Sequence, residues 1–132
     1  MPDEPKWKLK DYVDERGRNR IQDWLLGHAD GDRAKINARL RHLTRYEKLE
    51  FPLYRRFKKP WRKLGEVRIK TRDFEIRILC CMGPGSGVVT MLLGTHKKKG
   101  DVSDGEKATA ARRMELAKAS PKARTIEHDL EG

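Results

Sequence analysis

The chain has 132 residues, enough for one domain with one modest core, and 39% of them are charged against 36% hydrophobic. It has no apolar run of membrane-spanning length, no apolar signal stretch at its polar N-terminus, and two adjacent cysteines that cannot easily bridge within a strand. We therefore expect a cytoplasmic protein with no membrane partner. The net charge of +11 points to a polyanionic partner, with nucleic acid as the first candidate, unless the basic surface serves solubility alone.

The first half of the chain predicts one strand followed by two helices. Residues 7–13 alternate apolar and polar side chains, as a half-buried strand does. Residues 19–27 predict an amphipathic helix that begins with Asn19 as its cap. Residues 32–49 predict a second helix, and the short link between the two favours a helical hairpin.

The second half predicts a connector, three strands and a last helix. Residues 50–65 form a basic, aromatic-rich connector in which two prolines argue against a continuous helix. Alternating apolar residues and intervening turn residues predict three strands, at residues 66–71, 74–82 and 88–96. A capping box at Ser103 starts a helix that runs to about residue 119, and residues 120–132 are expected to form a flexible tail.

This order of elements predicts a single α+β domain with its core at about residues 7–119. An N-terminal strand and a helical hairpin precede an antiparallel sheet and a C-terminal helix, with the helices over one face of the sheet. The first two strands of the sheet pair in a definite register if Arg72 and Asp73 form a two-residue loop. Their apolar residues then share one face, and the other face carries Arg68 opposite Arg77 and Lys70 opposite Glu75.

The Arg68–Arg77 pair is the most informative feature of this sheet. Like charges directly opposite each other are destabilising, and local rules are often broken at functional sites. Two neighbouring guanidinium groups offer planar donor forks that suit a phosphate. The alternative is that Glu66 and Glu75 neutralise the pair and the face is merely solvated.

The third strand extends this face in the predicted register. A six-residue loop after Met82 would place Gly94 beside Arg77 and His96 opposite Glu75. Gly94 would then leave open backbone where a ligand approaches. His96 and the lysines that follow it would add positive charge at this end of the sheet.

Four segments, in the right order and spacing, resemble the phage-derived HigB-like toxins of the RelE/ParE superfamily. The segment 62–69 is similar to a strand of that family with the pattern L-x-x-x-E-L-R, and residues 76–79 are similar to its Y-R-I-L strand. Residues 92–99 resemble its L-L-H-G-F-x-K-K segment, and residues 103–115 resemble its C-terminal helix. The resemblance covers residues 60–117.

The resemblance implies a RelE-like fold and a ribosome-dependent mRNA endonuclease that is inhibited by an antitoxin, often a helix–turn–helix protein. The positions that match family residues, and that we predict to be catalytic, are Arg68, Arg77, His96, Lys97 and Lys98. The sequence departs from the pattern where His96 replaces an aromatic residue, where Gly94-Thr95 replaces H-G, and where Ile76 replaces an aromatic residue. The superfamily also contains gyrase poisons without RNase activity.

RNA can be cut without a metal when its own 2′-hydroxyl attacks the adjacent phosphate. This reaction needs a base, cations around the phosphorane and a proton donor for the 5′-oxygen. We assign the phosphate clamp to Arg68 and Arg77 and the proton transfers to His96 or a lysine. Further RNA or phosphate contacts are predicted at Lys70, Arg113, Arg62, Lys63, Lys58 and Lys59.

No cofactor is expected, and no metal site, because Cys80-Cys81 lacks ligand spacing. Phe57 and Trp61 either stack on bases or pack in the core. Two other functions remain open: a non-enzymatic toxin that inhibits gyrase or the ribosome, and a basic RNA-binding module without toxicity.

Overall fold

A mixed six-stranded sheet forms the centre of the computed structural model, which describes residues 5–49, 53–72, 75–97 and 100–131. The strand order across the sheet is β2-β3-β4-β5-β1-β6. The strands are β1 (Lys8–Tyr12), β2 (Tyr54–Arg56), β3 (Leu64–Lys70), β4 (Glu75–Met82), β5 (Val88–Lys97) and β6 (Thr125–Glu127). The α+β class is confirmed, but the sheet is not purely antiparallel, because β1 runs parallel to β5.

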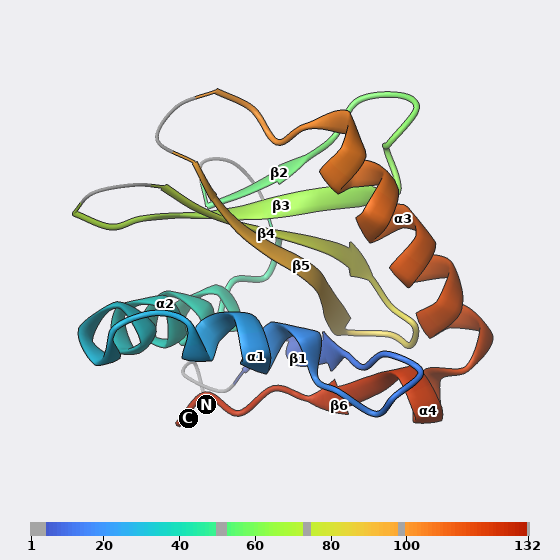
Figure 1. Cartoon of the computed structure of the whole chain (residues 1–132), viewed down its shortest axis with the longest axis horizontal. Helices are drawn as coiled ribbons and strands as arrows, with labels where there is room; N and C mark the ends of the chain where they lie inside the picture. The colour runs from blue at the N-terminus through green and yellow to red at the C-terminus, as the bar shows by residue number, and fades with distance from the viewer. Residues whose placement is uncertain (1–4, 50–52, 73–74, 98–99, 132) are drawn as a thin grey trace.

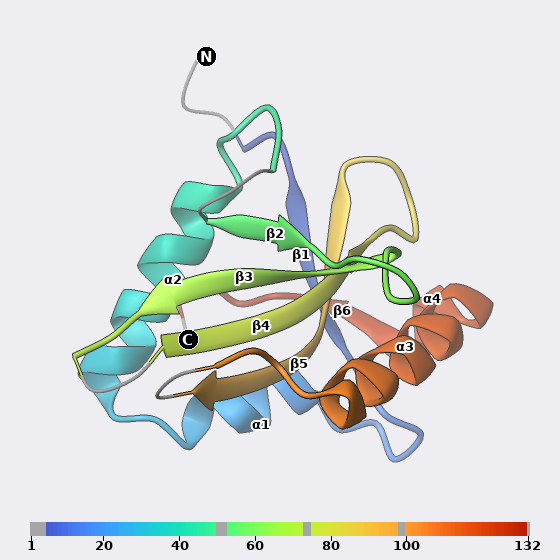
Figure 2. The ribbon, with the colours of Figure 1, turned by 90° about the horizontal axis from the view of Figure 1, so that it is seen from above.

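Helices cover both faces of the sheet, which corrects the prediction of helices over one face (Figures 1 and 2). On one face, α1 (Arg20–Leu26) and α2 (Asp30–Leu43) bury their apolar side chains against β3, β4 and β5. On the other face, α3 (Asp104–Ala119) packs Ala110, Met114 and Ala117 onto the sheet. The two N-terminal helices follow one another as predicted, but α1 packs on β5 and β1 rather than alongside α2.

Both predicted helix caps are present. The Asn19 side chain accepts hydrogen bonds from the backbone N–H groups of Ile21 and Gln22. Ser103 and Glu106 form a reciprocal capping box at the start of α3. These side chains satisfy N–H groups that have no partner within the helix, which fixes where each helix begins. The second predicted helix ends six residues earlier than expected, at Leu43 instead of residue 49.

The predicted register of β3 and β4 is confirmed. Val67 pairs with Ile78, Arg68 with Arg77 and Lys70 with Glu75. The turn that was expected to impose this register includes residue 73, which lies outside the described part of the chain.

The predicted register of β4 and β5 is correct only near the loop between them. Cys80 pairs with Met91 as expected, but a β-bulge shifts every pair beyond it by one residue. Arg77 therefore lies opposite Thr95 instead of Gly94, and Ile78 lies opposite Gly94. Because adjacent residues of a strand face opposite sides, the bulge also moves Gly94 and His96 to the face covered by α1.

Gly94 is required by the helix that packs on it. A Cβ built at Gly94 would lie 2.1 Å from Cδ2 of Trp24, which lies in α1. The indole ring thus rests directly on the strand backbone. Gly94 is a packing residue, and the expected open approach for a ligand beside Arg77 is wrong.

We expect Gly94→Ala to lower the free energy of unfolding by about 1–3 kcal/mol, the usual cost of overpacking a core. Urea denaturation measures this change. The matched control is Gly31→Ala, because a Cβ at Gly31 meets nothing within 4 Å. Equal effects of the two substitutions would contradict the close contact with Trp24.

The C-terminal segment is folded, which corrects the prediction of a flexible tail for residues 120–131. A short helix, α4 (Pro121–Arg124), leads into β6, which pairs with β1. The buried His128 side chain contacts Asp11 through Nδ1 at 2.8 Å and Asn37 through Nε2 at 2.9 Å. The contact with His128 also explains why β1 carries a buried acidic residue, Asp11, at a position where its pattern would otherwise favour an apolar one.

Strand β2 lies within the connector that was expected to be irregular. It pairs with the edge of β3, and the Tyr54 ring lies across Gly65, where a Cβ would be 2.2 Å from its Oη. The two cysteines are free and buried, with Cys80 in one core cluster and Cys81 in the other.

Candidate functional site

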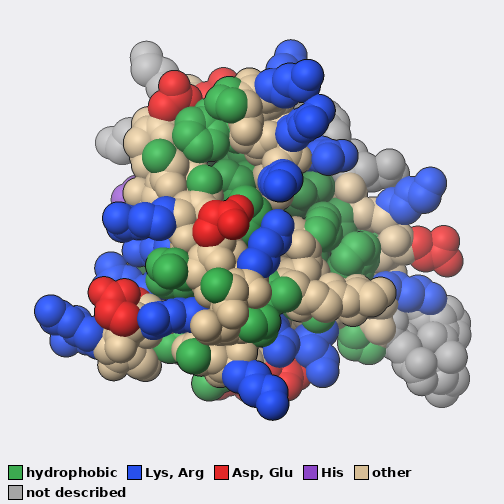
Figure 3. Space-filling model, turned by 90° about the vertical axis from the view of Figure 1, so that its right-hand side faces the viewer, with side chains coloured by type: hydrophobic (Ala, Val, Ile, Leu, Met, Phe, Trp, Pro, Cys, Tyr) green, Lys and Arg blue, Asp and Glu red, His purple; other side chains and the backbone are tan. Residues whose placement is uncertain are grey.

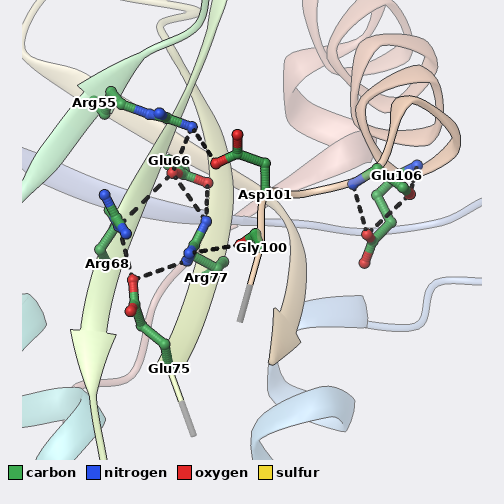
Figure 4. Close-up of polar contacts among 9 residues, drawn as sticks. Arg55, Glu66, Arg68, Glu75, Arg77, Gly100, Asp101 and Glu106 are labelled. Carbon is green, nitrogen blue, oxygen red and sulfur yellow. Dashed lines mark hydrogen bonds and ion pairs between the residues drawn. The ribbon is translucent and has the colours of Figure 1, made fainter. Parts of the chain in front are cut away.

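The candidate site lies on the α3 face of the sheet, at the end of β3 and β4 that α3 does not cover (Figure 4). Three arginines and three carboxylates meet there, and we call this set the ion-pair cluster. Its members are Arg55, Glu66, Arg68, Glu75, Arg77 and Asp101. The alternation of β3 and β4 places four of these side chains on one face, and β2 and the segment before α3 add the others.

Arg77 is the centre of the ion-pair cluster. Its Nη1 lies 3.3 Å from Oε1 of Glu66, and its Nε donates to Oε1 of Glu75 at 3.0 Å. Its Nη2 donates to the carbonyl oxygen of Gly100 at 3.0 Å. All three nitrogens of the guanidinium group are therefore bound to the protein. Only 4% of the Arg77 side chain is exposed, which leaves little surface for a ligand.

The opposition of Arg68 and Arg77 is resolved by the carboxylates between them. The Nε atoms of both arginines donate to the same oxygen of Glu75, at 2.8 and 3.0 Å. Glu66, fully buried, lies within ion-pair distance of both and of Arg55. The neutralisation considered from the sequence as the alternative is therefore present in the structure.

Arg68 differs from Arg77 in the donors that it leaves available. Its side chain is 28% exposed, and within the described residues its η nitrogens donate no hydrogen bond. A guanidinium group with two outward nitrogens matches the oxygens of a phosphate. Of this pair, Arg68 is thus the arginine whose η nitrogens no described residue occupies.

Burial and the neighbouring arginines have opposing effects on the pKa of Glu75. Partial burial alone would raise the pKa of this carboxyl, but the hydrogen bond from Arg68 and the positive charges of Arg77 and Arg68 hold its pKa below the ordinary value. Glu75 therefore stays ionised and keeps both guanidinium groups in place.

A pH dependence of stability follows from the lowered pKa of Glu75. The ionised carboxylate stabilises the fold above its unfolded pKa of about 4.3, and this contribution is lost as the pH falls through the lower folded-state pKa. We expect Tm of the wild type to fall more steeply than Tm of Glu75→Gln as the pH drops below about 4.3. Thermal scans of both proteins from neutral to acidic pH measure the difference, and parallel curves would contradict it.

Two members of the ion-pair cluster were missed in the sequence. Arg55 lies on β2, where no strand was expected, and it bridges Glu66 and Asp101 at 3.2 Å each. Asp101 and the Gly100 carbonyl follow β5 in the chain, and no local pattern marks them. Only the pairing of β2 with β3 and the return of the chain toward α3 bring them to Arg77.

The structure separates His96 from the arginines. His96 pairs with Ile76, and its ring meets the ring of His28 edge to face at 5.9 Å on the α1 side of the sheet. The backbone of Lys97 lies opposite Glu75, while its side chain and all of Lys98 lie outside the described part of the structure.

The other predicted RNA contacts fall into three places. Lys70 is exposed at the end of β3, beside the ion-pair cluster. Arg113 lies over the Tyr12 ring and donates to the carbonyl of Leu92 at 2.8 Å, and burial lowers its pKa. None of the described contacts of Arg113 involves Arg68 or Arg77.

The remaining four basic residues line two grooves beside the loop between β2 and β3. Arg62 and Lys63 line a groove of about 680 Å³ together with Arg56 and Lys118, and its described lining includes no acidic residue. Lys58 and Lys59 line a second groove with Phe57 and Trp61, which also pack against the core beneath α3. Lys and Arg side chains are spread over this side of the molecule with hydrophobic side chains between them (Figure 3).

The described residues contain no group of three or more His, Cys, Asp or Glu side chains placed to hold a metal ion. They also contain no helix that is both long and apolar enough to span a bilayer.

The fold and the site define a basic α+β domain with a mixed sheet, compatible with a RelE-like fold, and an arginine-rich cluster at one end of that sheet. The family model described as Phage derived protein Gp49-like (DUF891) matches residues 23–115, which is more than half of the chain. The chain therefore belongs to the phage-derived Gp49-like family, a family associated with RelE/ParE-like toxins. No curated protein matches it significantly.

Proposed function

We propose that the protein is the toxin of a toxin–antitoxin system and cuts messenger RNA on the ribosome by metal-independent attack of the 2′-hydroxyl. The observation that carries this proposal is the placement of Arg68, whose outward η nitrogens lie at the rim of a buried cluster that fixes its Nε. Membership in the Gp49-like family supports the toxin part of the proposal.

The residues take different roles in this proposal. Arg68 binds the scissile phosphate and stabilises the charge that grows on the phosphorane. Arg77 is a positioning residue, because it is buried and acts through Glu75, which in turn holds Arg68. A positioned guanidinium group loses no orientation freedom during the reaction, which is why such a support favours the transition state.

Proton transfer is assigned to the lysines that flank Glu75. Lys70 lies opposite Glu75 on β3, and Lys97 lies opposite it on β5. Lys98, which the family resemblance also marks, follows directly. One of these lysines accepts the 2′-hydroxyl proton and another protonates the 5′-oxygen. His96 is a weaker candidate for these steps because it pairs with Ile76 on the other face.

The partners that we propose are a cognate antitoxin, with a helix–turn–helix protein as the type that the resemblance implies, and mRNA bound to the ribosome. The net charge of +11 supports association with RNA-rich surfaces.

Expression in growing bacteria with mapping of mRNA ends tests the proposal. Two reporter messages are compared that are identical except for the start codon, so that only one of them is translated. We expect growth arrest and new 5′ ends within the translated message alone. Growth arrest without new ends would instead identify a non-enzymatic inhibitor of gyrase or the ribosome, and normal growth would contradict the toxin assignment.

A further inference from the structure

A second pocket opens at the edge of the sheet, directly beside the ion-pair cluster. It lies between α2 and the outer edge of β3, next to the point where the Arg68 backbone N–H binds the carbonyl of Leu53. Its volume of about 510 Å³ falls in the range of small-molecule sites. The residues that line it are Arg39, His42, Tyr46, Leu53, Arg68, Ile69, Lys70 and Glu75.

One wall of this pocket is aromatic and exposed. His42 lies in the last turn of α2 and Tyr46 lies just beyond the end of this helix. Their ring centres are 5.0 Å apart, and Nε2 of His42 is 2.9 Å from Oη of Tyr46. Trp7 fixes the backbone at this point, because its Nε1 donates to the carbonyl of Tyr46 at 2.9 Å. Tyr46 is nonetheless 44% exposed, so a ligand in the pocket can reach its ring.

The rim of the pocket is cationic. Arg39, Arg68 and Lys70 line it against a single carboxylate, Glu75, which is already bound by two guanidinium groups. Within the described residues, the side chains of Arg39 and Lys70 make no hydrogen bond and no ion pair, although the backbone of Lys70 pairs with Glu75. The pocket therefore combines a wall of two aromatic rings, which meet edge to face, with positive charge at one edge.

We infer that this pocket receives one unstacked base of single-stranded RNA, with the phosphate of the same nucleotide held at Arg68 and Lys70. The inference rests on the proposed function and adds a base-binding subsite to it. Aromatic side chains beside a cationic track are the usual means by which proteins bind single-stranded RNA. Leu53 and Ile69 supply the apolar floor that a base face requires.

The position of Arg68 ties the pocket to the cleavage site. Its side chain belongs both to the ion-pair cluster and to the lining of the pocket. A phosphate at Arg68 therefore leaves the adjoining base within reach of Tyr46. The pocket thus selects the nucleotide beside the scissile bond, and cleavage prefers sequences whose base fits there.

Binding of short RNAs that contain one abasic position tests this inference. Each RNA carries a 2′-deoxy group throughout the segment that is cut, so that only binding is measured, by fluorescence anisotropy. For the wild type we expect one abasic position to weaken binding by about 5- to 150-fold, the usual range for loss of one stacked base. For Tyr46→Ala we expect this penalty to disappear.

Two variants distinguish loss of the ring from loss of the fold. Tyr46→Phe keeps the ring and is expected to keep the abasic penalty. Leu26→Ala removes an apolar side chain that is 57% exposed on α1 and is expected to change nothing. A wild type with no sensitive position, or a penalty that persists in Tyr46→Ala, would overturn the inference.

The outcome is independent of the proposed enzymatic activity. If RNA is cut in cells but no abasic position weakens binding, the endonuclease proposal is retained and the base pocket is rejected. A penalty that depends on Tyr46 without any cleavage in cells would keep the pocket and remove the endonuclease. Loss of antitoxin binding in Tyr46→Ala, with no change in RNA binding, would assign the pocket to a protein partner and overturn the inference.

Discussion

Arg68→Ala is expected to lower the rate of RNA cleavage by about 10²–10³-fold, the usual effect of removing one group that stabilises transition-state charge. The reason is that its two η nitrogens are outward donors on a guanidinium group whose Nε is fixed at 2.8 Å from Glu75. Single-turnover cleavage of mRNA on programmed ribosomes measures the effect.

Arg68→Lys is the informative companion variant. It keeps the positive charge but not the planar donor fork, so we expect it to recover only part of the lost rate. Because Arg68 is 28% exposed, the free energy of unfolding of both variants is expected to lie within about 1 kcal/mol of the wild-type value. Cleavage at the wild-type rate by folded Arg68→Ala would contradict the assignment of Arg68 to the phosphate.

Glu66→Ala is expected to lower the free energy of unfolding by about 3–5 kcal/mol, because it removes the buried one of the two carboxylates that pair with the buried Arg77. Glu66 has no exposed surface and lies 3.3 Å from Nη1 of Arg77, whose side chain is itself only 4% exposed. Urea denaturation measures the loss.

The matched control for Glu66 is another carboxylate of the same cluster. Asp101 binds Arg55 at 3.2 Å, as Glu66 does, but its side chain is 70% exposed. Asp101→Ala is therefore expected to cost less than about 1 kcal/mol. If the two substitutions destabilise the protein equally, burial is not what makes Glu66 important.

Local chemistry made much of the fold predictable. The caps at Asn19 and Ser103 and the period-two pattern of β3 and β4 are signals carried by neighbouring residues, and the structure contains all of them. The opposition of Arg68 and Arg77 followed from that register alone. The predictions that were wrong concern contacts between segments far apart in the sequence. Strand β6 forms by pairing with the edge of β1, and His128 is buried where it contacts Asp11 and Asn37.

The candidate site was predictable to the same extent. Its strand residues and the carboxylates that neutralise the arginines were identified from alternation along β3 and β4. Arg55, Gly100 and Asp101 were not, because they join the ion-pair cluster through tertiary folding rather than through any spacing in the sequence. His96 was assigned to the wrong face because the pattern of apolar and polar residues along β5 does not show where the one-residue bulge lies.

That bulge makes the contents of the site depend on how one residue of β5 is accommodated. Leu79 pairs with Leu93 and Cys80 pairs with Met91, so Leu92 is the extra residue of the bulge. Pairing of the same residues without the bulge would rotate the rest of β5 by half a turn about its axis. The imidazole of His96 would then lie opposite Glu75, on the face that carries the arginines, and Gly94 would no longer lie beneath Trp24. Loss of the bulge at constant chain length would therefore change which β5 side chains share a face with Arg68 and Arg77, without any substitution among the arginines and carboxylates themselves.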